Sequence, residues 1–212
     1  MKSILLSIFI FICVISYGQK KHTIFNGKDL NDWVIIVGDS TVNPEEYFYV
    51  KNGMIETVGV PAGYIRTKKE FTDYHLHVEW RYPENPTNSG VMIHVNGPDK
   101  IWVSHYQAQL KVLNAGDFIV HGVGERATIN DSTYVSTETV KPVVPKLHPT
   151  NEKPASEWNS YDIYCNGNKI ELNVNGLLQN AATNCSLTKG AIGLQAEGSK
   201  IQFRNLWIEK IK

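Results

Sequence analysis

Several signatures of common catalytic folds are missing from this 212-residue chain. It has no G-x-S-x-G nucleophile elbow, no H-E-x-x-H zinc helix and no phosphate-binding P-loop. Basic runs are also missing, and 21 Lys and Arg balance 21 Asp and Glu. Nothing in this charge pattern predicts nucleic acid or an anionic membrane as a partner.

Long apolar runs are scarce, and the one that is present opens the chain. Lys2 precedes the apolar stretch Ile4–Ile15, and Ser16-Tyr17-Gly18 fits a small-x-small cleavage site. The run is too short to span a membrane, and a polar chain follows it. We therefore expect residues 1–18 to be a signal peptide, the protein to be secreted or periplasmic, and the mature protein to have no transmembrane segment.

Cysteine is scarce too, and residues 19–212 are expected to form one domain. Loss of Lys2 leaves 20 basic against 21 acidic residues, so the mature chain is close to neutral. Only Cys165 and Cys185 remain, and their spacing does not match a zinc site. Export would permit a disulfide, and the sequence leaves a disulfide and two free buried thiols equally open.

Alternation of apolar and polar residues dominates the chain, whereas no long segment has a helical period. Lys51-Asn52-Gly53 and Gly167-Asn168 are hairpin signals, Asn175-Gly176 is a further turn signal, and short helical turns are expected near Gly27–Trp33. The expected strands are Tyr47–Val50, Met54–Thr57, Tyr74–Tyr82, Gly90–Val95, Tyr106–Leu113, Phe118–Val120, Tyr161–Asn166, Lys169–Val174, Gly190–Ala196 and Lys200–Lys210. This pattern predicts an all-β jelly-roll β-sandwich of two antiparallel sheets, with the last strand beside an early one.

Residues Asn130–Pro154 lack a clean period and are expected to form a long excursion with up to two edge strands. Long ordered loops are often functional, and a solvated insertion is an equally good interpretation.

The strand Tyr74–Tyr82 places His75, His77, Glu79 and Arg81 on the face opposite its apolar row. Other strands repeat the pattern, so we expect one continuous polar face rich in imidazole, amide, carboxylate and guanidinium groups. Such groups suit hydroxyl-rich ligands, and Trp33, Trp102 and Trp158 could add flat platforms. A merely solvated face is nearly as good an interpretation.

Glu79, Arg81 and His94 are the candidate catalytic residues, and His94 and His121 are the candidate acids or bases near neutral pH. The paired carboxylates of laminarinase-like glycosidases, Glu-x-Asp-x-x-Glu, are missing. The candidate substrate-binding residues are His77, Asn88, Gln107, Gln109, Lys111, His121, Glu157, Trp158, Gln195 and Glu197.

Several short motifs occur in an order that is typical of one family. Phe25–Trp33 resembles its FNGKDLxxW opening, and Glu79-Trp80-Arg81 followed by Asn88–Val91 resembles its ExR…NSGV block. Later matches are Gln109, Glu157-Trp158-Asn159, Val174-Asn175-Gly176, Gly193-Leu194-Gln195 and Phe203-Arg204-Asn205. Together they resemble the 3-keto-disaccharide hydrolase domain family, in a secreted form as in Bacteroidota, over roughly residues 23–211.

The resemblance implies a concanavalin- or laminin-G-like jelly roll that binds an oligosaccharide or glycoside on its concave sheet. It also implies cleavage of 3-keto-glycosides, in which a base removes the acidified C2 proton and the glycosidic oxygen at C1 then leaves. Glu79 or a histidine would be the base, and Arg81 or a divalent cation (Ca or Mn) would face the enolate oxygen.

Two positions depart from the commonest family pattern, because Gln107 replaces a carboxylate and Glu197 replaces a histidine. These changes indicate either another substrate or a non-catalytic carbohydrate-binding module. Both alternatives remain open from the sequence, as does an adhesion or scaffold role.

Overall fold

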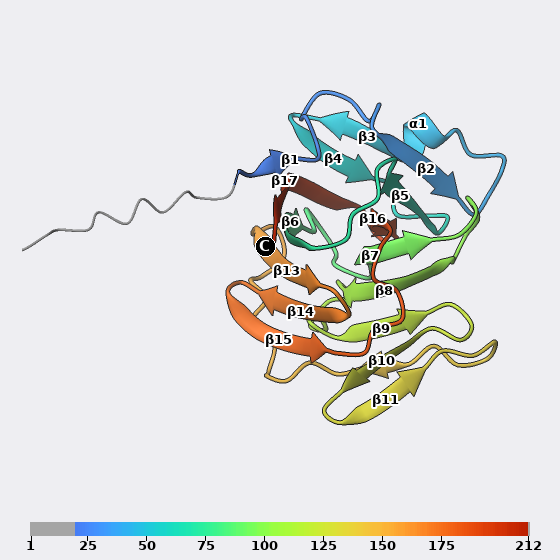
Figure 1. The fold of residues 1–212 in the computed structure, drawn as a ribbon. Coiled ribbons are helices and arrows are strands. Elements are labelled where there is room, and N and C mark those ends of the chain that lie inside the picture. The colour runs from blue at the N-terminus through green and yellow to red at the C-terminus, as the bar shows by residue number, and fades with distance from the viewer. Residues whose placement is uncertain (1–19, 212) are drawn as a thin grey trace, which may run out of the picture.

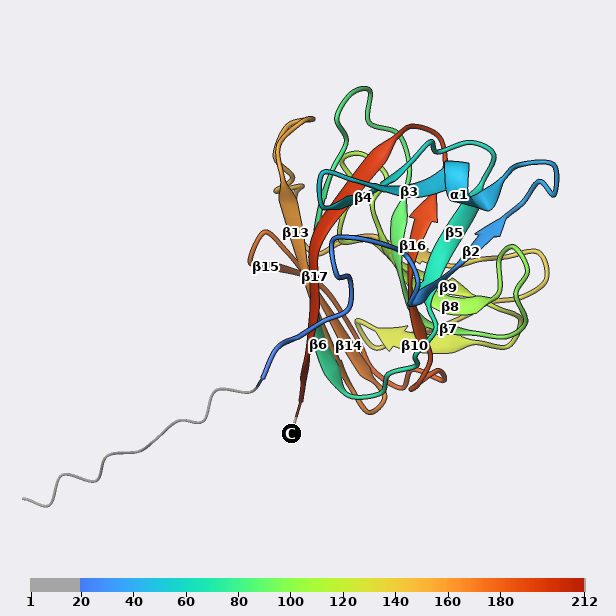
Figure 2. The same cartoon turned by 90° about the horizontal axis from the view of Figure 1, so that it is seen from above.

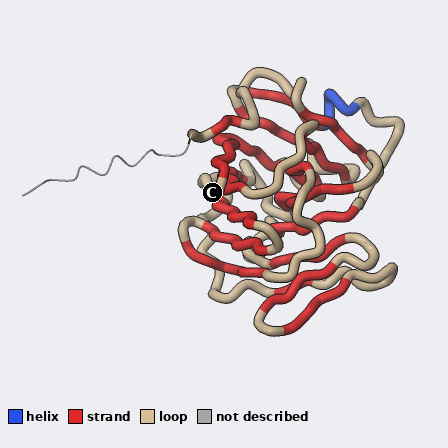
Figure 3. The backbone as a smooth tube through the Cα atoms, in the orientation of Figure 1, coloured by secondary structure: helices blue, strands red, loops and turns tan. Residues whose placement is uncertain are grey.

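The structure is a computed structural model that describes residues 20–211, so the expected signal peptide lies outside the described residues. Figure 1 shows a chain built almost entirely of strands, and Figure 3 shows the loops that join them. The elements are β1 (His22–Thr23), β2 (Trp33–Val37), α1 (Pro44–Tyr47), β3 (Phe48–Lys51), β4 (Met54–Thr57), β5 (Gly63–Thr67), β6 (Tyr74–Arg81), β7 (Gly90–Asn96), β8 (Ser104–Gln109), β9 (Phe118–His121), β10 (Arg126–Ile129), β11 (Ser132–Val135), β12 (Val143–Val144), β13 (Asn159–Asn166), β14 (Lys169–Val174), β15 (Leu177–Ala182), β16 (Ala191–Ala196) and β17 (Ile201–Lys210).

Two antiparallel sheets pack face to face. Sheet A has the order β15-β14-β13-β6-β17-β4-β3, with β1 paired to β17, and sheet B has the order β12-β9-β8-β7-β16-β5-β2. Figure 2 shows β13, β6 and β17 of sheet A on one side and β16, β5 and β7 of sheet B on the other. The predicted all-β sandwich is confirmed, and the last strand does lie beside the early strand β4.

The core lies between the sheets and is formed by the apolar rows that the alternation predicts. Leu76, Val78 and Trp80 of β6 are buried in it, as are Tyr106 and Ala108 of β8. Because alternate strand residues point to opposite faces, burial of these rows fixes which residues face outward from each sheet.

Tight turns of the expected type close the hairpins. Asn52 and Gly53 have φ values of +51° and +74° between β3 and β4, a conformation that asparagine and glycine tolerate. Asn175 and Gly176, with φ values of +47° and +81°, close the β14–β15 hairpin in the same way.

The helical expectation was misplaced. Residues 27–32 form bends and one turn that lead into β2, and the short helix α1 begins instead after Asn43, whose side chain accepts a hydrogen bond from the backbone of Glu45. An N-cap with proline at the next position is a local helix signal. The edge strand β2 was missed because its apolar run does not alternate.

The excursion 130–154 contains β11 and β12; β12 is an edge strand of sheet B, as expected, whereas β11 pairs with β10 in a separate two-stranded sheet. Both cysteines are free buried thiols, and burial raises the pKa of each to about 12. No helix in residues 20–211 is long and apolar enough to span a membrane.

Candidate functional site

The prediction of one continuous polar face is wrong, because the sandwich divides that face between two sheets. Glu79 and Arg81 belong to β6 in sheet A, whereas Gln107 and Gln195 belong to β8 and β16 in sheet B. The apolar rows of all three strands meet in the same core. Their polar rows therefore point in opposite directions and cannot contact one ligand molecule.

On the outer face of sheet A, the side chains satisfy one another. Glu79 accepts hydrogen bonds from Arg204 Nε at 2.6 Å and Asn205 Nδ2 at 3.0 Å. Burial acts to raise the pKa of Glu79, but these hydrogen bonds and the charge of Arg204 outweigh it and the pKa is lowered. Arg81 donates to Gln202 Oε1 at 2.6 Å. Both predicted catalytic groups thus have structural partners.

The rest of this face is bonded in the same manner. His75 Nε2 and His77 Nδ1 each lie 2.8 Å from the same oxygen of Asp162, the residue that β13 places opposite His77. Trp158 contacts the guanidinium groups of Arg81 and Arg204, at 4.6 and 3.9 Å from its ring centroid. Trp158 therefore packs against two arginines rather than being presented as a sugar platform, and the neighbouring Glu157 is exposed.

His94 does not lie on either polar face. It has a φ of +52° within a bulge in β7, where the pairing register with β8 shifts between Ile93 and Asn96. The extra residue turns the His94 ring inward against Tyr74, with centroids 5.7 Å apart. Burial lowers its pKa, and the structure does not bring it near Glu79 or Arg81.

A hollow on the outer face of sheet B collects the other candidates. Its volume is about 270 Å³. It is lined by Asn88, Trp102, Gln107, Gln109, Ile119, His121, Lys141, Val143, Gln195 and Glu197. Six of the ten predicted substrate-binding residues therefore share one site, whereas Lys111, His77, Glu157 and Trp158 lie outside it. We call it the amide hollow.

A chain of side-chain hydrogen bonds crosses the amide hollow. Gln107 Nε2 donates to Gln195 Oε1 at 3.0 Å, and Gln195 Nε2 donates to Glu197 Oε2 at 2.8 Å. Asn88 Nδ2 donates to the same carboxylate oxygen at 2.9 Å. These bonds hold one oxygen of Glu197 in place and leave its second oxygen free for a ligand.

The Asn88-Ser89-Gly90 segment, which belongs to the NSGV block, builds this site. Ser89 Oγ donates to the carbonyl of Gln195 at 2.7 Å and so joins β7 to β16. A Cβ atom on Gly90 would lie 2.6 Å from the amide of Gln107. Only glycine lets the Gln107 side chain lie flat across β7.

Gln109 has a fixed orientation. Its Oε1 accepts hydrogen bonds from the backbone N–H groups of Leu110 and Lys111, at 2.9 and 3.0 Å. Because its oxygen is held by the backbone, its NH₂ group is the end that remains for a ligand.

Two aromatic rings, Trp102 and His121, line one wall, and the fully buried His105 stacks against His121. His105 and His121, direct partners on β8 and β9, stack with centroids 4.3 Å apart, and Trp102 lies 6.4 Å beyond His121. Burial is the main cause that lowers the pKa of His105 to about 4 and that of His121 to about 2. Both rings are therefore neutral at physiological pH, and His121 cannot act there as a strong acid.

Buried polar atoms without partners gather here. Seven such side-chain atoms occur in the part of the chain that the structure describes, and four belong to Asn88, His105, Gln107 and His121. Since His105 donates from Nδ1 to the carbonyl of Val103 at 2.7 Å, its Nε2 is an acceptor. Unsatisfied buried acceptors are costly, so the unpaired acceptors of the lining, Asn88 Oδ1 and Gln107 Oε1, suit ligand hydroxyl groups that donate to them.

The described residues do not suit the divalent cation that was the alternative to Arg81. No group of three or more His, Cys, Asp or Glu in residues 20–211 is placed to hold a metal. The rings of His105 and His121 lie only 11° from parallel, so their in-plane lone pairs cannot converge on one ion. One carboxylate also supplies too few oxygens for Ca²⁺, which takes six to eight.

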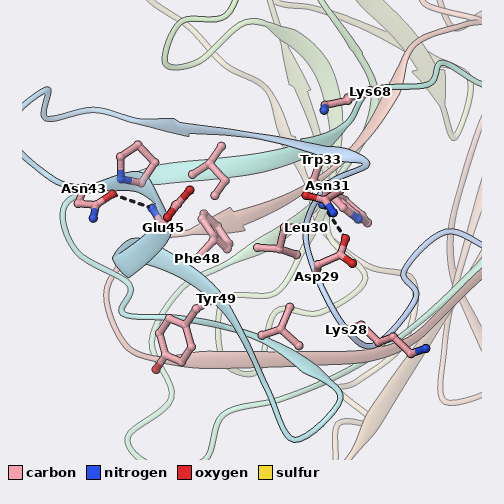
Figure 4. Close-up of a pocket in the computed structure, with 13 residues that line it drawn as sticks. Lys28, Asp29, Leu30, Asn31, Trp33, Asn43, Glu45, Phe48, Tyr49 and Lys68 are labelled. Atoms are coloured by element: carbon pink, nitrogen blue, oxygen red, sulfur yellow. Dashed lines mark hydrogen bonds between the residues drawn. The ribbon is translucent and has the colours of Figure 1, made fainter.

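A larger cavity lies elsewhere, between the edge strands β2 and β3 (Figure 4). Its volume is about 670 Å³, and the FNGKDLxxW segment lines much of it. Polar groups there serve local structure, since Asp29 Oδ1 accepts from the backbone N–H of Asn31 at 2.9 Å and Asn43 Oδ1 accepts from that of Glu45 at 3.2 Å. Trp33 is only 5% exposed and belongs to the core, so it is not a platform.

Sequence reasoning missed three residues of the amide hollow, Ile119, Lys141 and Val143. Lys141 and Val143 come from the excursion 130–154, so this segment does border the site. Their lack of periodicity gave no signal, and only the pairing of β12 with β9 brings them to sheet B.

Comparison with known proteins agrees with this architecture. A model of the 3-keto-alpha-glucoside-1,2-lyase-like domain family matches residues 20–209. A candidate glycosyl hydrolase from Parabacteroides distasonis has a TM-score of 0.65 at 22% identity, covering 91% of this chain and 100% of that one. No curated protein matches the chain.

Two more distant solved structures have similar folds. The Bacillus licheniformis beta-glucanase has a TM-score of 0.59 at 13% identity and covers 93% of this chain and 100% of its own. The Bacillus subtilis carbohydrate-binding module CBM66 has a TM-score of 0.57 at 10% identity, covering 86% and 98%. These similarities show the concanavalin-like fold that the resemblance implied.

Proposed function

The chain belongs to the 3-keto-alpha-glucoside-1,2-lyase-like domain family, and we propose that it is an exported enzyme that cleaves a 3-keto-glycoside held in the amide hollow. The observation that carries this proposal is the set of buried, unpaired polar atoms on Asn88, Gln107 and His121, which line the hollow. Ligand hydroxyl groups would donate to or accept from these atoms. The hollow has a volume of about 270 Å³. Pockets for drug-sized ligands typically have volumes of about 300–1,000 Å³, so this smaller hollow suits one sugar ring.

Glu197 is the proposed base, in place of Glu79. A ketone at C3 acidifies the proton on C2, and the free oxygen of the Glu197 carboxylate takes that proton. The electron pair of the C–H bond moves toward C3, whose oxygen becomes an enolate that the NH₂ group of Gln109 can stabilise. When the enolate collapses, the C1–O bond breaks, and water later adds to the resulting double bond.

Elimination suits this site better than ordinary glycoside hydrolysis. Hydrolysis by retention or inversion uses two carboxyl groups that flank the scissile bond. Glu197 is the one carboxylate among the residues that line the amide hollow. A single base is sufficient for removal of the C2 proton.

A non-catalytic carbohydrate-binding module is the second candidate. The observation that favours it is that Asn88 Nδ2 and Gln195 Nε2 both donate to Glu197 Oε2. A carboxylate fixed in this way could accept hydrogen bonds from sugar hydroxyl groups without any catalysis. The departures at Gln107 and Glu197 both lie in this hollow and are compatible with either function.

Incubation with 3-keto and unoxidised disaccharides, with and without a chelator, distinguishes the candidates. We expect cleavage of the 3-keto sugar alone and loss of that cleavage in Glu197→Gln, with sugar binding retained because glutamine keeps an acceptor oxygen. Glu171→Gln, an exposed change on β14 of sheet A, is the matched control. Binding without turnover of either sugar by the unmodified protein would favour the module, and full activity of Glu197→Gln would refute the assignment of the base.

A further inference from the structure

A second hollow adjoins the amide hollow. Its volume is about 300 Å³, and we call it the outer hollow. It is lined by residues of the loop between β7 and β8, by Gly122 and Val123, and by the segment Ser136–Glu138. Trp102 and Lys141 line both hollows, so they form the boundary between them.

Lys141 is held at this boundary by its backbone. The next residue, Pro142, accepts a hydrogen bond from the Val120 N–H at 3.1 Å, and Val143 then pairs with Ile119 of β9. The exposed Lys141 side chain reaches toward Trp102, with Nζ 5.9 Å from the ring centroid. Its backbone is thus anchored while its ammonium group can move between the two hollows.

Lys141 is also the one cationic residue among those that line the amide hollow. Glu197 is the one anionic residue there, and His121 is the only other ionisable group. His121 stacks on a second neutral imidazole and is largely buried, at 8% exposure. An ammonium group carries a proton at neutral pH, so the lining offers one ready proton donor and one ready proton acceptor.

We propose that the outer hollow holds the leaving group of the bound glycoside and that Lys141 is the catalytic acid for it. This inference rests on the proposed function. As the C1–O bond breaks, its electron pair stays on the glycosidic oxygen, and the Lys141 ammonium gives that oxygen a proton. The leaving group departs as a neutral alcohol, Lys141 becomes a neutral amine, and Glu197 holds the proton taken from C2.

The outer hollow favours a hydroxylated alcohol as the leaving group. Its lining includes the hydroxyl groups of Ser104 and Thr137, the carboxylate of Glu138 and the ammonium of Lys100. These groups can bond several sugar hydroxyls, whereas a purely apolar alcohol would leave them without partners.

The test compares two leaving groups on the same 3-keto-glucoside. A nitrophenolate leaves without needing a proton, whereas a sugar alcohol requires one. General acid catalysis contributes roughly 10²- to 10⁴-fold. Lys141→Met is therefore expected to lower kcat for the disaccharide by about that factor and to change kcat for the nitrophenyl substrate by less than about threefold.

Controls separate this role from binding and from folding. Lys169→Met, an exposed change on β14 of sheet A, should leave both substrates unaffected. Glu138→Trp, which reduces the outer hollow, should raise KM for the disaccharide but not for a methyl 3-keto-glucoside. Equal loss on both leaving groups in Lys141→Met would overturn the acid role, and failure of the unmodified protein to cleave either substrate would overturn the proposed function as well.

Discussion

Gly90→Ala tests whether the amide hollow is the binding site. A Cβ atom at this position would lie 2.6 Å from Cδ and Nε2 of Gln107 and 2.7 Å from its Cγ. Ordinary contact begins near 3.4 Å, so the amide must move by roughly 0.8 Å or more. Such a shift stretches its bonds to Gln195 Oε1 and Gln109 Oε1, now 3.0 and 3.3 Å, beyond normal length.

The expected loss appears in binding rather than in folding. Misplacing one buried amide costs about 1–3 kcal/mol of ligand binding, which is roughly a 5- to 150-fold increase in Kd. Overpacking against a flexible side chain costs about 1 kcal/mol of stability, and the smaller entropy of the unfolded alanine chain offsets about 0.4–1 kcal/mol of it. The midpoint of thermal unfolding should therefore fall by no more than about 4 °C.

Titration calorimetry with a disaccharide and a thermal unfolding scan measure the two effects. Gly193→Ala is the matched control, because it lies on the same outer face and its Cβ would approach Met92 at 3.1 Å rather than an amide of the hollow. We expect its Kd to stay unchanged while its unfolding midpoint falls similarly. An unchanged Kd in Gly90→Ala would refute the reasoning, since the displaced amide would then play no part in binding.

The remaining predictions concern the opposite sheet and the neutral histidines. Glu79→Gln should keep full turnover of a 3-keto-disaccharide, since Glu79 lies on sheet A, and should lose about 1 kcal/mol of unfolding free energy in denaturant titration, because the bond to Arg204 is partly screened by solvent. Loss of turnover with an intact fold would restore Glu79 as the base. The pKa values of His105 and His121 are about 4 and about 2 in the folded chain. In the unfolded chain a histidine has a pKa of about 6.5, so below that pH the unfolded chain binds protons that the folded chain does not. Stability should therefore fall as pH drops from about 6.5 toward 4, and His105→Gln should reduce that slope by up to about 1.4 kcal/mol per pH unit; an unchanged slope would show that His105 is not held neutral by the fold.

Local patterns determined most of the fold from the sequence. Period-2 alternation in β6 and β8 identified both strands and their buried rows, because burying one face of a strand requires apolar residues at every second position. Asn-Gly pairs identified two hairpins, because few residues tolerate positive φ. The amide-rich rows around Gln107, Gln195 and Glu197 were visible for the same reason.

The tertiary structure alone decided which polar rows share a site. The alternation of apolar and polar residues predicts that Glu79 and Gln107 both face away from a core. It does not predict that their strands belong to different sheets. The bulge at His94 and the approach of Lys141 through β12 also depend on pairing between distant segments. A sequence pattern predicts which residues of a single strand face the core, but not which strands become its neighbours. A binding site is formed by strands that long-range pairing brings together.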